Sequence, residues 1–288
     1  MISVKTKKFH VRLIFLAALL CQGAAHGKVE TVLGSLPIET NPNLAIGLPE
    51  SNLPEIVLSR EQYVISYNKE NRNPNWVAWK LELNQMGNSG RTNVFEQDSE
   101  LASYLNHSGS AQSAVEPTEY KGSCLDRGHQ IPSADRTDTE DNNRATFIMS
   151  NMIPQTPYLN RVIWEHLEHY TRELVRSQGK KVYVIAGPIY DEDFGMIGPK
   201  SNIRVPSKDF KVIFILDANQ SPADISASTQ SIAVIMPNTM QDGSHPTLDG
   251  SKCPIFEEPR VVDMNDWQKY QTTVTEVENL SGIKIIRH

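Results

Sequence analysis

The middle of the chain constrains the fold most, because two strand patterns and one helix pattern follow one another within residues 124–177. Residues 124–131 and 146–150 are predicted to be strands. From Leu159 to Ser177, apolar residues recur at steps of three and four, which predicts an amphipathic helix with one face turned inward. The first strand carries Asp126-Arg127-Gly128-His129-Gln130. One short block thus holds a histidine, arginines, an amide and a carboxylate.

Four side chains of this block have the chemistry that phosphodiester hydrolysis needs. His129 can take a proton from water because the reference pKa of histidine lies near neutrality; the role needs the neutral form, so activity is predicted to fall in acid. Arg127 offers a two-pronged donor for phosphate. The amide oxygen of Asn160 is a hard ligand suited to magnesium. Glu168 lies about 12 Å further along a regular helix and roughly 80° around it, which suits an indirect role beside the ion.

Each of these residues also has a structural alternative. A lone Asp-Arg-Gly-His motif more often holds a structural histidine, and an asparagine before a helix is usually a cap. Glu165, His166 and His169 are predicted to form a solvated helix face. Ser133 and Ser150 have little support as nucleophiles, because no strand-turn-helix elbow surrounds either of them.

The rest of the chain predicts a sizeable α+β body. Residues 28–58 are rich in Pro, Asn and Gly and are predicted to be an extended lead-in. Residues 133–144 are predicted to loop or to form one helical turn, and the chain from Val274 onward is predicted to be a short tail. A helix is predicted over 98–106. Further strands are predicted over 61–67, 76–83, 182–186, 212–216 and 232–236, the last three buried.

The N-terminus has the layout of a secretory signal peptide over residues 1–27. A basic start is followed by an apolar run over 13–21 and small residues at 23–25, with cleavage predicted after Ala25 or Gly27. A membrane anchor is the alternative, but the run is about half the ~20 residues that a spanning helix needs. The sequence therefore predicts a secreted or periplasmic protein without a membrane anchor.

Removal of the signal leaves two cysteines, Cys124 and Cys253. In an oxidising compartment, two thiols far apart in sequence are most simply a disulfide, and two separate buried thiols are the alternative. Zinc is disfavoured, because neither cysteine has a Cys or His partner at ligand spacing.

The net charge of most of the chain argues against a polyanionic partner, but the charge of residues 121–181, which carry the motif, does not. The whole chain has a net charge of −6. Residues 28–120 hold twelve acids and six bases, whereas residues 121–181 hold eight acids and nine bases. The acidic surroundings predict weak, strongly salt-sensitive binding of nucleic acid. Several arginines could contact phosphate, and the sequence does not sort them: Arg127, Arg136, Arg144, Arg161, Arg172 and Arg176.

Longer stretches resemble the DNA/RNA non-specific endonuclease family, which includes secreted bacterial nucleases and endonuclease G. The resemblance is carried by residues 126–132, by Ala145 to Gln155 (Ala-Thr-Phe-Ile-Met-Ser-Asn-Met-Ile-Pro-Gln), and by Leu159-Asn160, Trp164 and Leu167-Glu168. It extends back to residues 76–80 and forward to 182–188. It thus covers most of residues 60–240.

The resemblance implies a mixed sheet with packed helices and a ββα-metal active-site motif, within a single nuclease domain over 59–288. It implies His129 as general base and Asn160 as the single protein ligand of Mg²⁺, for which Mn²⁺ would substitute. Glu168 would orient water on the metal and Arg127 would steady phosphate. Asn151 would support the site, and Arg91 is the nearest candidate for a further arginine.

The resulting hypothesis is a secreted, magnesium-dependent endonuclease that cleaves DNA and RNA with little sequence specificity. Two alternatives remain: a non-catalytic nucleic-acid-binding or metal-binding protein on the same scaffold, and a phosphodiesterase for small substrates. The trio His129, Asn160 and Glu168 favours the enzyme, because a binding module has no need of it. The oligomeric state is not fixed by the sequence, which is compatible with a homodimer.

Overall fold

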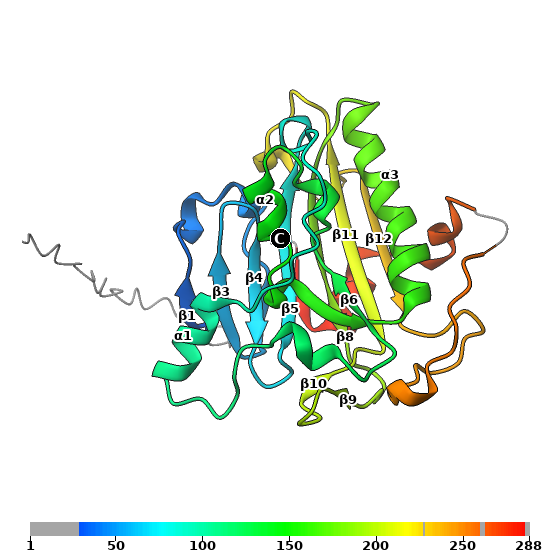
Figure 1. The fold of residues 1–288 in the computed structure, drawn as a ribbon. Helices are drawn as coiled ribbons and strands as arrows, with labels where there is room; N and C mark the ends of the chain where they lie inside the picture. The colour runs from blue at the N-terminus through cyan, green and yellow to red at the C-terminus, as the bar shows by residue number, and fades with distance from the viewer. Residues whose placement is uncertain (1–28, 227, 260–262, 286–288) are drawn as a thin grey trace, which may run out of the picture.

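A large, mostly antiparallel sheet forms the centre of the computed structural model, which describes residues 29–226, 228–259 and 263–285 (Figure 1). The predicted signal peptide lies outside these residues. The strand order is β1-β3-β4-β5-β8-β11-β12-β13, and only the β1–β3 pair is parallel. The strands are β1 (Val29–Leu33), β3 (Glu55–Ser59), β4 (Val64–Asn68), β5 (Asn73–Leu81), β8 (Lys181–Ile189), β11 (Lys208–Leu216), β12 (Ser231–Pro237) and β13 (Gln271–Thr272).

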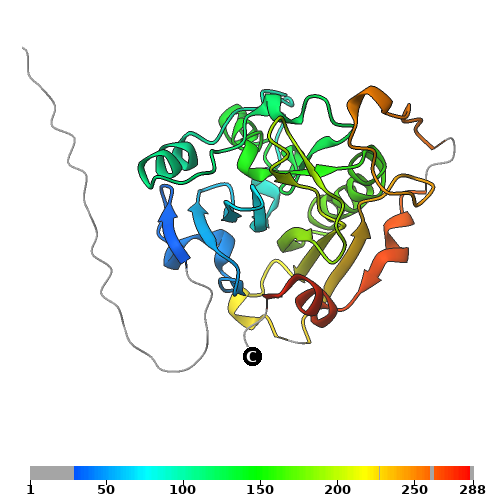
Figure 2. The ribbon, with the colours of Figure 1, turned by 90° about the horizontal axis from the view of Figure 1, so that it is seen from below.

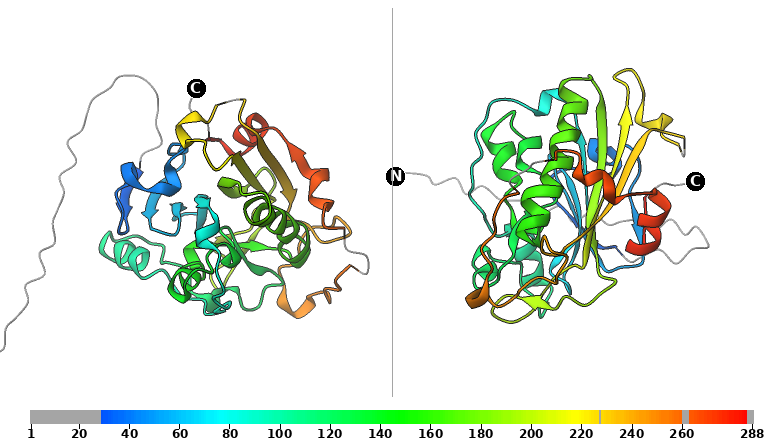
Figure 3. Two further views of the ribbon diagram at one scale, coloured as in Figure 1. Left: turned by 90° about the horizontal axis from the view of Figure 1, so that it is seen from above. Right: turned by 90° about the vertical axis from the view of Figure 1, so that its right-hand side faces the viewer.

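The central strands are buried on both faces, because the sheet is covered on both sides. One face packs against α3 (Trp164–Arg176), and the other against the C-terminal helix α4 (Val274–Ser281). Figure 2 and the right-hand view of Figure 3 show these two helices on opposite sides of the sheet. Two shorter helices, α1 (Ser99–His107) and α2 (Glu140–Ala145), lie on the α3 side (Figure 1). The predicted α+β class, with its mixed sheet, is confirmed.

A small hairpin on the α3 side carries the motif. It pairs β6 (Asp126–His129) with β7 (Met152–Gln155) in antiparallel register. The predicted strand over 146–150 is wrong: these residues form a turn and the start of a 3-10 helix, Met149–Asn151, and the second strand begins only at Met152. The error arose because β-branched and apolar residues here fill a core turn, with Thr146 and Phe147 completely buried.

The expected ends of the domain also differ from the structure. The described part of the predicted lead-in, residues 29–58, is not separate from the domain, because β1 and β3 belong to the main sheet and β3 is buried throughout. The predicted tail after Val274 contains α4 and β14 (Ile283–Lys284), which pairs with β2 (Glu50–Ser51). In both segments a short apolar run is flanked by turn residues. The strand with which each run pairs is therefore seen only in the structure. One further two-stranded pair joins β9 (Met196–Ile197) to β10 (Ile203–Arg204).

The two cysteines form the predicted disulfide, Cys124–Cys253, across 129 residues of sequence. It ties the segment just before β6 to the loop that follows β12. Next to it the two backbones meet, since the amide of Gly250 donates to the carbonyl of Gly122 at 2.9 Å. The bridge therefore holds the C-terminal part of the chain against the base of the motif hairpin. Within the described residues, no helix combines the length and apolar character needed to cross a bilayer.

Candidate active site

The backbone that presents His129 is fixed by a completely buried asparagine. Asn151 accepts a hydrogen bond from the amide of Ile131 at 3.1 Å, and its Nδ2 donates to the carbonyls of Ile131 at 3.0 Å and Thr146 at 2.9 Å. All these bonds go to backbone, and Asn151 has no exposed surface. It therefore cannot touch a substrate, and its part in the site is to hold β6 and the following turn in place.

Asn160 lies in a widened turn of the helix that follows the hairpin. Residues Leu159–Ile163 form a π turn that continues directly into α3. A π turn takes more residues per revolution than an α turn and is frequent at functional sites. The angular offset between Asn160 and Glu168 is therefore smaller than the roughly 80° of a regular helix, and the two side chains are turned toward a common face.

The orientation of the Asn160 amide is set by a carboxylate. Its Nδ2 donates to Oδ2 of Asp126 at 2.9 Å, and the same carboxylate binds Arg161 through two hydrogen bonds of 2.6 and 2.7 Å. A carboxylate only accepts hydrogen bonds, so the amide nitrogen must face Asp126 and the oxygen must face away. Among the residues that the structure describes, none donates to this oxygen. Asn160 thus presents a free, neutral oxygen ligand.

His129 is enclosed by aromatic rings. The side chain of Phe147 meets the imidazole edge to face at 4.8 Å between centroids, and Phe95 lies at 5.7 Å. Trp164 of α3 donates to the backbone carbonyl of His129 at 3.3 Å, which joins the helix to the hairpin. Burial, helped by the charges of Arg91 and Arg127, lowers the pKa of His129 to about 3. The imidazole is therefore neutral far into the acid range.

Two arginines beside His129 have no carboxylate partner among the described residues. The guanidinium of Arg127 stacks on the ring of Phe95 at 3.9 Å. Arg91 stacks on Phe147 at 4.9 Å and donates to the hydroxyl of Ser133 at 2.7 Å. Stacking leaves the edge donors of Arg127 available. Arg91 keeps Nη2, since its Nε donates to Asn93 and its Nη1 to Ser133, so both arginines can bind an anion in front of His129. The structure thus brings Arg91 next to the motif, as the loose sequence match suggested.

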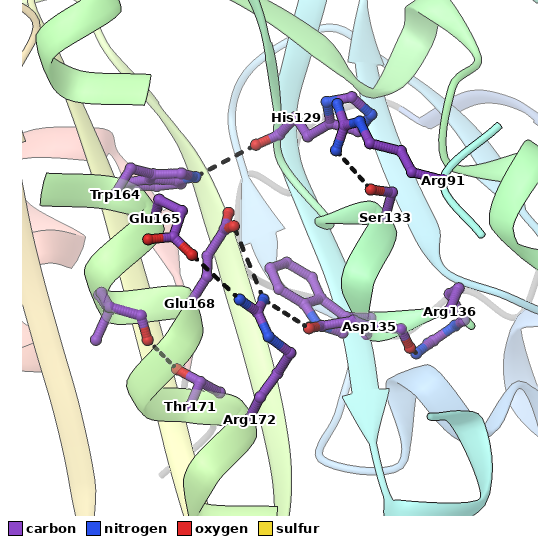
Figure 4. Close-up of polar contacts among 12 residues, drawn as sticks. Arg91, His129, Ser133, Asp135, Arg136, Trp164, Glu165, Glu168, Thr171 and Arg172 are labelled. Atoms are coloured by element: carbon purple, nitrogen blue, oxygen red, sulfur yellow. Dashed lines mark hydrogen bonds and ion pairs between the residues drawn. The ribbon is translucent and has the colours of Figure 1, made fainter. Parts of the chain in front are cut away.

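Glu168 points from α3 into the space between this helix and the segment that bears His129 (Figure 4). Its carboxylate lies 3.5 Å from Nζ of Lys211 and 4.0 Å from Nη1 of Arg172. Burial raises the pKa of Glu168 to about 7, although both cations oppose the rise. Arg172 is also 3.5 Å from Asp135, whose other oxygen accepts a hydrogen bond from Trp79 at 2.9 Å. Glu168 therefore belongs to a buried network of charges.

The remaining arginines separate into distinct environments. Arg136 is 1% exposed and donates to backbone carbonyls, which makes it a structural residue. Arg144 pairs with Glu96 and Arg161 with Asp126. Arg172 alone among them joins Glu168 next to the site. Sequence reasoning grouped it with the others, although its position four residues after Glu168 on a helix was a usable signal.

The donor set fits a hard cation that keeps most of its own water. No group of three or more His, Cys, Asp or Glu side chains in the described part of the chain could hold a metal ion. This excludes a closed cage of such ligands there. Asn160 is half-buried, and its amide oxygen could hold a hard divalent cation that keeps most of its water.

Two strands followed by a helix, with the histidine on the first strand and the amide at the start of the helix, define a ββα-metal class of site. The profile of the DNA/RNA non-specific endonuclease family matches residues 39–287, and the chain belongs to this family. Five of the six predicted site residues belong to this hairpin, the helix after it and the adjoining loop, and the sixth, Asn151, lies in the core, where it was expected to support the site. The role of each in catalysis is a prediction. Asp126, Asp135 and Lys211 also contact these residues or their partners and had no assigned role, whereas Arg172 was among the possible phosphate contacts.

Sequence relatives agree with this assignment. The chain is 38% identical over 250 residues to a nuclease of Nostoc sp., covering 83% of this chain and 78% of that one. It is 31% identical over 222 residues to a nuclease of Serratia marcescens, covering 75% and 76%. Human mitochondrial endonuclease G is 31% identical over 200 residues, covering 65% of this chain and 62% of that one.

A solved structure supports the fold. A chain from the crystal structure of the complex between EndoG and EndoGI superposes with a TM-score of 0.64 at 24% identity, over 86% of this chain and 91% of that one. At this identity the match concerns the fold alone.

Proposed function

We propose that this protein is a secreted or periplasmic, magnesium-dependent endonuclease that hydrolyses DNA and RNA with little sequence preference. The observation that carries the proposal is the pair of arginines without carboxylate partners, Arg91 and Arg127, that flank a buried neutral histidine. A neutral imidazole accepts a proton, and the arginines neutralise the phosphate that would otherwise repel the nucleophile. The signal-like N-terminus and the disulfide support export.

His129 takes the proton from the attacking water. Its Nε2 is buried without a hydrogen-bond partner among the described residues, so this nitrogen is not engaged by another side chain or by the backbone there. Glu168 accepts a hydrogen bond from water at the site and so orients it. Arg91 and Arg127 bind the non-bridging phosphate oxygens. Magnesium on the amide oxygen of Asn160 would supply positive charge for the phosphate and the leaving 3′-oxygen. The products would carry 5′-phosphate ends.

Little sequence preference follows from what the site contacts. Phosphate carries no sequence information, and the arginines and the cation address phosphate only. Acceptance of RNA requires that nothing beside the site clashes with the 2′-hydroxyl. The acidic chain weakens binding, so activity is expected to drop steeply as salt rises.

The proposal is tested with purified protein on plasmid DNA and on RNA, with and without magnesium, followed by sequencing of the fragment ends. We expect cleavage of both polymers, random cut sites and 5′-phosphates. Binding without cleavage would favour the non-catalytic alternative, and cleavage of small diesters alone would favour the phosphodiesterase. A sharp consensus at the cut sites, or refusal of RNA, would show that bases or sugars are read.

The pH dependence should report Glu168 rather than His129. Since the pKa of His129 is lowered to about 3 and that of Glu168 is raised to about 7, only Glu168 changes charge near neutrality. Glu168 is ionised above its pKa and protonated below it, so kcat/KM should fall as the pH drops below about 7. Glu168→Gln should be slower, with a nearly flat profile from about pH 5 to about pH 8. An unchanged acid limb in Glu168→Gln would assign the titration to His129, as the sequence alone suggested.

A further inference from the structure

A lysine is buried in the middle of the central sheet, where an apolar residue would be expected. Lys211 lies on β11, paired with Ala186 of β8 and Val234 of β12. The residue is only 1% exposed, and its two neighbours in β11, Phe210 and Val212, are completely buried. Lysine is almost never fully buried unless its charge is paired.

The ammonium of Lys211 reaches through the aromatic core to the active-site carboxylate. Its Nζ lies 3.9 Å from the ring centroid of Trp164 and 5.8 Å from that of Trp79. Beyond the rings it meets Oε1 of Glu168 at 3.5 Å. The two tryptophans favour the cation, because the face of an indole attracts positive charge. Lys211 is therefore directed from the sheet toward one side of the Glu168 carboxylate, and Arg172 approaches from the helix.

Stability alone does not account for this lysine. Taking an ammonium and a carboxylate out of water costs several kcal/mol per ion, and apolar residues of similar volume in place of a buried pair are often neutral or stabilising. Methionine would fill this space without a charge. The buried pair of Lys211 and Glu168 adds little stability and lies at the site. Its presence is best explained by an effect of Lys211 on the Glu168 carboxylate.

We propose that Lys211 is a positioning residue that holds the Glu168 carboxylate ionised and oriented toward the reacting phosphate. This rests on the proposed role of Glu168. Without Lys211, Arg172 is the one cation within 4.0 Å of the carboxylate among the described residues. Glu168 then turns toward Arg172 and takes up a proton more readily. The groups that face Glu168 are Lys211 from β11, Arg172 and Glu165 from α3, Asp135 from the turn after β6, and Arg91 from the loop before α1.

A double-mutant cycle tests whether Lys211 acts through Glu168. The variants are Lys211→Met, Glu168→Gln and the combination, with kcat and KM measured on plasmid DNA. Loss of an outer partner of a metal site typically costs about 10–100-fold, so Lys211→Met should lose kcat in this range with KM nearly unchanged. The combined variant should be no slower than Glu168→Gln alone, because the partner is already lost. Lys208→Met, on the same strand, is the matched control and should keep wild-type kcat.

The pH dependence of stability is a second readout, because it would not change in the way described below if Lys211 were purely structural. In Lys211→Met, the carboxylate of Glu168 has lost a compensating charge, so its native pKa rises further. The native state then binds more protons than the unfolded state, and stability falls as the pH rises through that pKa. The urea midpoint of Lys211→Met should therefore drop between about pH 5 and about pH 8. The combined variant should lose the part of this extra pH dependence that belongs to Glu168. The part that remains belongs to buried Asp209, whose pKa the charge of Lys211 also lowers.

The outcomes separate the two proposals. An inactive wild-type protein would remove the proposed function itself. If the wild type is active but the rate losses of the two single variants multiply in the combined variant, Lys211 does not act through Glu168. The proposed nuclease function would then stand without the proposed role of Lys211. Wild-type kcat in folded Lys211→Met would do the same.

Discussion

Replacement of His129 by alanine is expected to lower kcat by about 10²–10⁴-fold, because loss of a general base alone costs this much. The imidazole is neutral, and no other described histidine lies beside Arg91 and Arg127. Initial rates on plasmid DNA at saturating magnesium measure the loss. Since the ring packs against Phe147 and Phe95, alanine also leaves a cavity. His129→Gln fills most of that space without supplying a base and should show a similar loss.

The matched control is another buried histidine on the same side of the molecule. His166 on α3 is 6% exposed, and its Nδ1 lies 2.9 Å from a carboxylate oxygen of Asp266. This pairing assigns it a structural role, so His166→Ala should lose stability but keep kcat within a few-fold, roughly the level of a surface change. Near-normal cleavage by folded His129→Gln would exclude His129 as the base. An equal loss in His166→Ala would show that kcat follows packing rather than chemistry.

The sequence predicted the parts of this molecule whose pattern is local. Long runs of β-branched residues mark β8, β11 and β12, and the apolar period marks α3. The cysteine pair was predictable from the signal-like pattern of residues 1–27 and from the count of remaining thiols. His129 and Asn160 could be selected because histidine and amide occur at a family spacing. In each case, residue types and their spacing along the chain hold the information.

The parts that were missed depend on contacts between segments. The π turn at Leu159–Ile163 has no mark in the apolar period, yet it changes the relation between Asn160 and Glu168. The pKa of His129 depends on enclosure by Phe95 and Phe147, which come from two loops. The predicted loss of activity in acid was therefore assigned to the histidine, whereas burial lowers the pKa of His129 and raises that of Glu168, so we expect Glu168 to titrate near neutrality.

Lys211 illustrates the same limit most clearly. In the sequence it interrupts an apolar strand, which is typical of a residue facing solvent at a sheet surface. Its partner Glu168 is 43 positions away, and the two meet only because α3 packs over β11. The charge network around Glu168 is thus a property of the packing of helix against sheet. Patterns within single segments cannot supply it.

The second large effect concerns the metal. Removal of divalent cations with a chelator should abolish cleavage, and magnesium or manganese should restore it. Asn160→Ala should then lose more activity than Glu168→Gln, since the first removes the direct ligand and the second an indirect group, for which about 10–100-fold is typical. Rates measured across a series of magnesium concentrations separate weaker binding from slower chemistry.

Asn160→Ala removes one oxygen ligand and leaves the salt bridge between Asp126 and Arg161 in place, so the fold should persist. A binding readout independent of catalysis is the shift in melting temperature with magnesium, because a ligand that binds only the native state stabilises it by mass action. Wild-type protein should gain stability with magnesium, and Asn160→Ala should gain much less. Glu168→Gln should keep most of the shift, since it is expected to act through water. An equal shift in Asn160→Ala would place the ion elsewhere, and full activity of the wild type in excess chelator would remove the metal from the reaction.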